Sequence, residues 1–233
     1  MKMKKKNMSI LAKKIKKIII LGPQGSGKDT QAIKLSKRLK IPQFSMGELL
    51  RQRAKKHDRL GIKIEKLLKT GKLLPIEIVS DVLFERLKKK DCKNGFILNG
   101  YPRSLEQYKA IENKGITPDV VLLIDIPEKE IIKRLSKRMQ CPKCGKPYVI
   151  ENYNPKKPPL CNECKVPLVR RADDEPKAIK QRIKVYNQET KPVLKIYKKK
   201  GLLVKINGYQ SIEDVHKEIM KKLLENSKMQ HKS

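Results

Sequence analysis

The residues with the clearest chemical potential are the glycines and the lysine of GPQGSGKDT at residues 22–30, which follow the pattern G-x-x-G-x-G-K-x-T. The segment stands between a β-branched run at 17–21 and an apolar pattern of helical spacing at 28–40. Glycines let successive backbone amides converge on a phosphate, and the start of the helix presents the positive end of its dipole. Lys28 can then bridge terminal phosphates, and Thr30 can place its hydroxyl near a metal ion. This order of residues predicts a nucleotide phosphate site.

A second motif is the spacing C-x2-C-x16-C-x2-C, formed by Cys141, Cys144, Cys161 and Cys164. In a chain that begins without an export signal, this spacing indicates metal binding in a reducing compartment, not disulfides. Four thiolates around Zn2+ leave no open position for water, so the metal would cross-link a segment too poor in apolar residues to form its own core. Nearby lysines also fit a zinc ribbon that binds nucleic acid, and the residues alone leave both uses open.

Arginine is scarce beside lysine and stands where planar, bidentate contact with phosphate would be useful. We expect a convergent set, comprising Arg51, Arg103, Arg134, Arg138, Arg171 and Arg182. The 233 residues contain 57 Lys+Arg and 24 Asp+Glu, and the net charge of +33 favours phosphate-bearing partners over acidic ones. The apolar runs are only strand-sized, so no membrane span is expected, and residues 1–15 form a basic extension that resembles neither a secretory signal nor a transit peptide.

The elements that must position these residues alternate between strands and helices. Strand-sized runs at 17–21, 96–98, 120–124 and 202–206 are separated by helix-length amphipathic segments, which predicts a parallel sheet with helices on both faces. Ser104 and Ser211 begin helices with a side-chain acceptor three residues later, and a long helical segment runs from Pro176 to about Lys200. Polar residues at 45–75 and Cys- and Pro-rich residues at 139–169 interrupt the alternation. The chain therefore forms one α/β domain with two insertions.

With these motifs in order, the chain resembles the adenylate kinases, within the nucleoside monophosphate kinases, and specifically the form whose lid carries a zinc site. The resemblance covers about residues 17–224. It rests on GPQGSGKDTQ at 22–31, FSMGELLR at 44–51, GKLLP at 71–75, NGYPRSLEQ at 99–107, RMQCPKCG at 138–145, CNEC at 161–164 and RRADDEPKAIKQR at 170–182.

The resemblance implies reversible, Mg2+-dependent transfer of the ATP γ-phosphoryl group to AMP, giving two ADP, in a cytoplasmic monomer. It also implies a P-loop fold with a five-stranded parallel core, a mobile arm that binds AMP, and a lid that carries structural Zn2+. The implied division is a core at 16–44, 76–138 and 170–225, an AMP-binding arm at 45–75, a zinc lid at 139–169 and a tail at 226–233.

Site residues carry over position by position. For ATP the resemblance implies Gly25, Ser26, Gly27, Lys28, Asp29, Thr30, Arg138 and Tyr148, with Tyr148 beside the adenine. For AMP it implies Met46, Arg51, Lys72, Leu73, Leu74, Gly100, Tyr101, Pro102, Arg103, Gln107, Arg171 and Arg182. Catalysis would depend on Lys28, Arg103, Arg138, Arg171 and Arg182. Such a ring of cations with Mg2+ suffices for phosphoryl transfer without a general base.

Three positions depart from the family's pattern. Asn99 stands where the family usually has an Asp near the Mg2+ water shell, and an Asn99→Asp change is expected to raise turnover at limiting Mg2+. Met46 replaces a Thr beside the AMP base, which keeps a kinase for another monophosphate as an alternative. Asp29 replaces a small residue and brings a carboxylate close to bound phosphates, unless it points away at the helix start. A basic, zinc-containing RNA-binding protein on a nucleotide-binding scaffold is the alternative from a different class.

Overall fold

The computed structural model describes residues 15–56, 58–70, 72–171 and 174–229. The basic extension expected at 1–15 lies outside the described residues except for Ile15, as do residues 230–233 of the tail expected at 226–233. Within the described ranges, no helix combines the length and apolar character that crossing a membrane requires.

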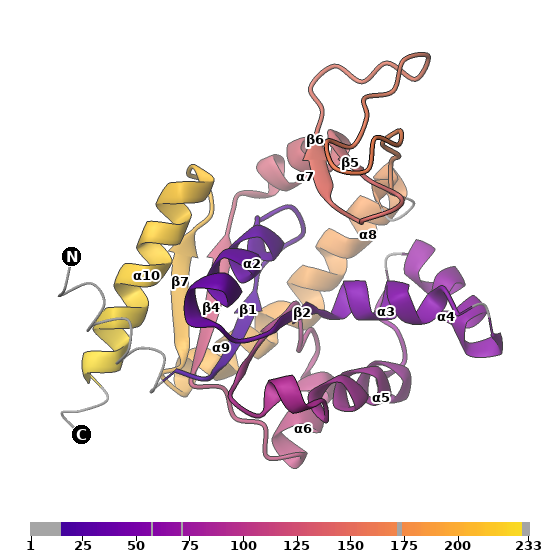
Figure 1. Ribbon diagram of the computed structural model, residues 1–233. Coiled ribbons are helices and arrows are strands. Elements are labelled where there is room, and N and C mark those ends of the chain that lie inside the picture. The colour runs from indigo at the N-terminus through magenta and orange to yellow at the C-terminus, as the bar shows by residue number, and fades with distance from the viewer. Residues whose placement is uncertain (1–14, 57, 71, 172–173, 230–233) are drawn as a thin grey trace.

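Five parallel strands form the central sheet, in the order β2-β3-β1-β4-β7 (Figure 1). Their bounds are β1 Lys17–Leu21, β2 Gln43–Ser45, β3 Phe96–Asn99, β4 Val120–Asp125 and β7 Leu203–Asn207. Four of these strands were predicted within one or two residues, but β2 was not, because its three residues carry no alternation that sequence could reveal. The predicted fold class, a five-stranded parallel sheet flanked by helices, is confirmed.

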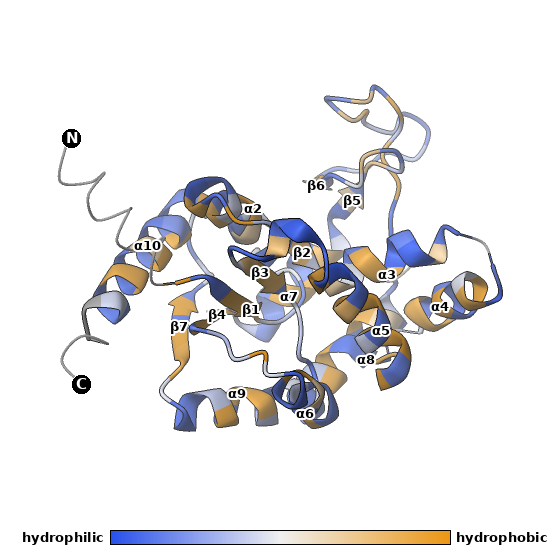
Figure 2. Ribbon diagram, turned by 60° about the horizontal axis from the view of Figure 1, so that its bottom comes forward, coloured by the Kyte–Doolittle hydropathy of each residue, from blue (hydrophilic) through white to orange (hydrophobic). Residues whose placement is uncertain are grey.

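Alternate residues of the strands face opposite sides of the sheet. In β1, Ile19 and Leu21 pack into a core with three helices, namely α5 Ile76–Leu87, α6 Leu105–Asn113 and α9 Lys191–Lys199. Ile18 and Ile20 pack into a second core with α2 Lys28–Leu39 and α10 Ile212–Met229. Figure 2 shows α2 and α10 on one side of the sheet and α6 and α9 on the other. Because both faces are covered, the strands read as continuous apolar runs and not as alternating ones.

The helices surround the sheet and extend to both sides of its carboxyl edge. The core helices are α2 Lys28–Leu39, α5 Ile76–Leu87, α6 Leu105–Asn113, α7 Glu128–Ser136, α8 Pro176–Val185, α9 Lys191–Lys199 and α10 Ile212–Met229. Residues 45–75 contain α3 Met46–Ala54 and α4 Arg59–Lys69, and a short 3-10 turn, η1, covers Lys90–Cys92. The antiparallel pair β5 Arg138–Gln140 and β6 Pro147–Val149 begins the cysteine-rich segment. Figure 1 places α3–α4 and this segment on either side of the carboxyl ends of the strands.

The long helix predicted from Pro176 to about Lys200 is interrupted. A π-helical turn, η3 Tyr186–Thr190, separates α8 from α9, and the Lys191 N–H donates to Tyr186 O five residues back. Pro192 explains the break, because it lacks an N–H and its ring displaces the carbonyl four residues earlier. The predicted end of the segment is confirmed, since Gly201 follows α9 with φ +69°.

Candidate active site

The loop between β1 and α2 has a backbone that only glycine accommodates. A Cβ on Gly22 would lie 2.2 Å from the carbonyl oxygen of Ile124 at the end of β4. Any residue other than glycine would therefore clash with β4 at this turn. Gly25 and Gly27 have φ of +75° and +88°, in the left-handed region that favours glycine. The glycines of the sequence motif therefore meet specific steric demands, and Gly27 leads directly into the first turn of α2.

Lys28 occupies the floor of the cleft above this loop. Its side chain is 8% exposed, and its ammonium donates a hydrogen bond to Pro23 O at 3.0 Å. Burial lowers the pKa of Lys28 to about 7; the charge of Asp29 opposes this effect, and nearby arginine charges add to it. A bound phosphate would restore the charged form, so the loop is electrostatically suited to bind an anion.

Two buried polar atoms of the loop have no hydrogen-bond partner within the described part of the chain. They are Ser26 Oγ and Gln24 Oε1. Ser26 is only 2% exposed, and an unpaired polar atom at that depth is costly unless a ligand or water satisfies it. The unpaired atoms indicate that the loop is completed by something it binds.

Arg134, one of the arginines expected to converge, supports the loop from α7. Its guanidinium donates to Gly25 O at 3.2 Å, to Gly208 O at 3.4 Å and to Glu130 Oε1 at 2.8 Å. Carbonyl oxygens of two separate loops are thus fixed by one planar group. The structure therefore assigns Arg134 to the backbone of the phosphate loop and not to the group of arginines in the cleft.

A buried carboxylate holds two of the cleft arginines. Arg138 donates to both oxygens of Asp174, from Nε at 2.6 Å and from Nη2 at 2.5 Å, and Arg182 Nη1 donates to Oδ1 at 3.3 Å. Asp174 is 1% exposed. No role for Asp174 was predicted from the sequence, because its arginine partners lie 36 and 8 residues away in the chain. An acidic pair beside several arginines is the signal that could have revealed it.

The turn after β3 is fixed by a chain of hydrogen bonds around Arg103. Arg103 Nε donates to Gly100 O at 2.7 Å, and its backbone N–H donates to Gln107 Oε1 at 2.7 Å. The predicted helix cap is confirmed, because Gln107 N donates to Ser104 Oγ. Thr190 Oγ1, at the π-helical turn, donates to Arg103 O at 2.9 Å. The backbone of Arg103 is thus held by Gln107 and Thr190, and its guanidinium is held by the Gly100 carbonyl.

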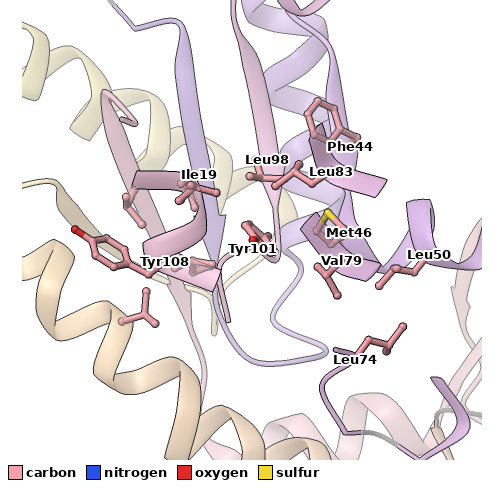
Figure 3. Close-up of a cluster of buried hydrophobic side chains, with 14 of the residues drawn as sticks. Ile19, Phe44, Met46, Leu50, Leu74, Val79, Leu83, Leu98, Tyr101 and Tyr108 are labelled. Atoms are coloured by element: carbon pink, nitrogen blue, oxygen red, sulfur yellow. The ribbon is translucent and has the colours of Figure 1, made fainter. Parts of the chain in front are cut away.

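The other end of the cleft is apolar. Met46 on α3 is 2% exposed and packs in one cluster with Leu50, Leu74, Val79 and Tyr101, which Figure 3 shows converging from α3, α5 and the turn after β3. Leu74 belongs to the segment just before α5, and together these side chains line a surface that can accept the flat, apolar faces of an aromatic ring system. It lies in the same cavity as the phosphate loop.

Most predicted site residues line this single cleft, whose empty space, including its open mouth, is about 1130 Å3. Those that line it are Lys28, Asp29, Met46, Arg51, Lys72, Leu73, Leu74, Gly100, Tyr101, Arg103, Gln107, Arg138, Arg171 and Arg182. Gly25, Ser26 and Gly27 form the loop beneath it, Thr30 lies in the first turn of α2, and Pro102 follows Tyr101 through a cis peptide bond. Val185, Tyr186 and Thr190 also line it and were not predicted.

The side chain of Asp29 lines the cleft and faces Asn99, so it does not point away at the start of the helix. The amide Nδ2 of Asn99, at the end of β3, donates to Asp29 Oδ1 at 2.5 Å. Partial desolvation within the cleft favours the neutral acid, but the charge of Lys28 and this hydrogen bond outweigh that effect and hold the pKa of Asp29 below its ordinary value. An Asn99→Asp change would set two carboxylates against each other, and its expected effect on turnover at limiting Mg2+ stays a prediction.

The four cysteines of the lid come together as predicted. Their sulfur atoms lie within 4.8 Å of one another, and Cys144 Sγ is 3.8 Å from Cys161 Sγ. Tetrahedral Zn2+ with Zn–S bonds of about 2.3 Å requires sulfur atoms about 3.8 Å apart. The backbone N–H groups of Cys144 and Cys164 donate to the first sulfur of their own pair at 3.4 Å. The residues therefore fit a structural zinc ion.

Tyr148 lies apart from the cleft residues, against the cysteine cluster. Its hydroxyl is 3.3 Å from Cys161 Sγ and accepts a hydrogen bond from Asn162 N at 3.1 Å. The ring packs beside the buried lid residues Met139 and Leu168. In this arrangement Tyr148 supports a zinc ligand, and its predicted contact with adenine stays a prediction.

The fold and the cleft define a P-loop nucleotide-binding protein whose site lies at the carboxyl ends of parallel strands. A family model described as adenylate kinase matches residues 20–202. The chain is 40% identical to an adenylate kinase of Kosmotoga olearia over 210 residues, or 88% of this chain and 98% of that protein. It is 41% identical to one of Thermotoga neapolitana over 88% and 95% of the two chains, and 38% identical to one of Finegoldia magna over 89% and 98%. The chain belongs to the adenylate kinase family.

The depressed pKa of Lys28 predicts that this residue lowers the free energy of unfolding of the nucleotide-free protein by an amount that depends on pH. An unfolded lysine titrates near 10.4, so between about pH 7 and 10 the folded chain binds fewer protons, and this residue's contribution to stability rises with pH. We expect Lys28→Met to raise the free energy of unfolding by about 1–3 kcal/mol at pH 7, with the gain fading towards pH 10. Urea unfolding across this range measures it.

Lys37→Met, at an exposed position on the last turn of the same helix, is the matched control and should show no such pH dependence. A gain from Lys28→Met that is the same at pH 7 and pH 10, or no gain at either, would contradict the electrostatic account of Lys28.

The cysteine geometry predicts one zinc ion per chain. Cys161→Ser should lower the zinc content well below one per chain and reduce the Tm, because a three-thiolate site binds the metal less tightly. Cys92→Ser is the control, since Cys92 is buried in the core and contacts Arg86 instead of the lid. Elemental analysis after chelator-free purification decides the matter; unchanged zinc in Cys161→Ser would refute a four-thiolate site.

Proposed function

We propose that the chain catalyses reversible transfer of the γ-phosphoryl group of ATP to AMP, giving two ADP. The observation that carries this proposal is one cleft that joins a phosphate loop to an apolar pocket through a row of cationic side chains. The bond between the γ-phosphorus and the bridging oxygen to the β-phosphate breaks, and a new bond forms to a phosphate oxygen of AMP. Family membership supports this reaction.

ATP would bind with its phosphates on the loop. The amides of Gly25, Ser26 and Gly27 lie at the start of α2, where the helix dipole favours negative charge. The unpaired Ser26 hydroxyl and the buried Lys28 ammonium provide further donors. Thr30 stands in the first turn of α2, where its hydroxyl can serve a metal ion beside the phosphates.

AMP would bind at the opposite end. Met46, Leu74 and Tyr101 provide the apolar surface for the base, and the backbone at Lys72 and Leu73 closes that pocket. The monophosphate would meet a separate group of cations and polar side chains, supported by the turn after β3. Its members are Arg51, Arg103 and Gln107, with Gly100 and Pro102 shaping the turn.

Transfer needs charge stabilisation and alignment more than proton abstraction. Negative charge spreads over the equatorial oxygens of the transferred group, and donors fixed beforehand stabilise it without reorganising. Arg138 and Arg182 are fixed by Asp174, and Arg103 by the turn after β3, while Arg171 lines the same space. Mg2+, when bound with ATP, would neutralise phosphate charge, and oxygen acceptors suited to its hydration shell are present at Asp29 and Asn99.

Closure over the cleft would exclude water and so prevent hydrolysis of ATP. We assign residues 45–75 to an arm that closes on AMP and 139–169 to a lid that closes on ATP, on a core of 16–44, 76–138 and 170–225. Zinc would hold the lid in one shape, because the buried apolar cluster there is small. Tyr148 would support this site and present its ring to the adenine. We further propose a cytoplasmic monomer.

The experiment is a coupled assay with Mg·ATP and AMP, GMP, CMP or UMP in turn. We expect AMP to be preferred at least tenfold in kcat/KM. A preference for another monophosphate would favour the alternative that buried Met46 raises for the base pocket. Tight, salt-sensitive RNA binding without turnover would instead support a nucleic-acid-binding protein on the same scaffold.

A matched pair of variants tests the arginine assignment. Arg171→Met should lower kcat by a factor of about 100 or more, because Arg171 lines the cleft. Arg170→Met should change kcat little, because Arg170 is exposed and donates to the Ser136 carbonyl outside the cleft. Equal effects of the two changes would remove Arg171 from the reaction.

A further inference from the structure

Asp29 is the one acidic side chain that lines the cleft among the described residues. Seven cationic side chains line the same cavity: Lys28, Arg51, Lys72, Arg103, Arg138, Arg171 and Arg182. A carboxylate within this group repels the phosphates that the cations attract. Its position in the first turn of α2 suits the helix dipole but does not explain why it faces the cleft, where solvent reaches it.

The contact between Asp29 and Asn99 arranges two kinds of oxygen side by side. The amide of Asn99 directs its Nδ2 to Asp29 Oδ1, which fixes the orientation of the group, since a carboxylate accepts and does not donate. Asn99 is fully buried at the carboxyl end of β3. Its Oδ1 has no hydrogen-bond partner in the part of the chain that the structure describes. An unpaired amide oxygen at this depth requires a donor from outside the protein.

Asp29 and Asn99 therefore supply hydrogen-bond acceptors in a cleft whose other charged side chains are hydrogen-bond donors. Lys28 and the arginines cannot share a polyphosphate with a bare carboxylate without loss of binding energy. A hydrated divalent cation changes this balance, because its water molecules donate to oxygen acceptors and its charge pairs with both the carboxylate and the phosphates. Mg2+ keeps several waters when it binds with phosphates, so acceptors for those waters are the appropriate surroundings.

We propose that Asp29 and Asn99 together hold the water shell of the Mg2+ that accompanies ATP, with the carboxylate supplied by α2 and the amide oxygen by β3. The inference rests on the proposed function and specifies how that site selects the metal complex of its nucleotide. Asp29 admits Mg·ATP and disfavours ATP without a metal. It is a positioning and selecting residue for the metal complex, not a proton donor or acceptor.

The test compares the Kd for ATP in EDTA with the Kd for Mg·ATP, by calorimetry, for the full chain and three variants. Asp29→Asn should bind metal-free ATP several-fold more tightly and Mg·ATP about tenfold more weakly, because outer-shell partners of a metal are typically worth 10–100-fold in affinity. The two affinities should thus move in opposite directions. A role of Asp29 in loop or helix structure alone would weaken both, and that result would overturn the proposal.

The reciprocal variant, Asp29→Asn with Asn99→Asp, exchanges the carboxylate and the amide across the same hydrogen bond. It should restore the ratio of the two Kd values to within a few-fold of the unaltered chain, whereas a ratio as low as that of Asp29→Asn would count against the proposal. Asp81→Asn, at an exposed position on α5, is the control and should leave both affinities unchanged. Failure of the unaltered chain to bind ATP in either form would instead overturn the proposed function.

The single change Asn99→Asp gives a readout without nucleotide. It places a buried carboxylate against Asp29, so the pair would retain one proton and its pKa would rise. The folded state then binds more protons than the unfolded state, and stability is lost as the pH rises from about 4 to 8. We expect the Tm in EDTA to fall below that of the unaltered chain progressively over this range. A constant difference in Tm would show that the two groups are not in contact.

Discussion

Mutual repulsion among seven cationic side chains in one cleft is the constraint on which the rest of the structure depends. Without bound anions these charges disfavour one another: burial lowers the pKa of Lys28, and the charges of Arg103, Arg182 and Arg138 lower it further. The protein holds the group in place with fixed acceptors. Asp174 pairs with Arg138 and Arg182, and a backbone carbonyl of the turn after β3 accepts from Arg103. Binding of phosphate then relieves a strain that the fold maintains.

The parallel sheet is what brings these acceptors to one edge. Its strands are parallel and in register, so the loop after β1, the turn after β3 and the contact between Gly22 and β4 lie at the same carboxyl edge of the sheet. Helices cover both faces, which leaves that edge as the place where polar groups remain accessible. The segments at 45–75 and 139–169 flank it. Apolar packing around Met46 joins the first to the main core, whereas four thiols and a small apolar cluster organise the second.

Much of this arrangement could be read from the sequence because it depends on local patterns. Three kinds of pattern can each be recognised within a few consecutive residues: the glycine spacing before Lys28, the two cysteine pairs and the apolar runs of four strands. The features that were missed depend on pairs far apart in the chain. Asp174 is buried by Arg138, 36 residues away, and Asn99 meets Asp29 across 70 residues. The sequence placed Asp29 near bound phosphates but revealed neither contact, and only the tertiary structure shows which groups these two acids hold.

We propose that one continuous cationic cleft holds both nucleotides at once, end to end through their phosphates. Calorimetry with a single ligand in which two adenosines are joined by five phosphates tests this arrangement most directly. We expect one ligand per chain, displacement of both ATP and AMP by that ligand, and an affinity that falls with rising salt concentration. Binding of two ligand molecules per chain, or displacement of only one of the two nucleotides, would contradict it.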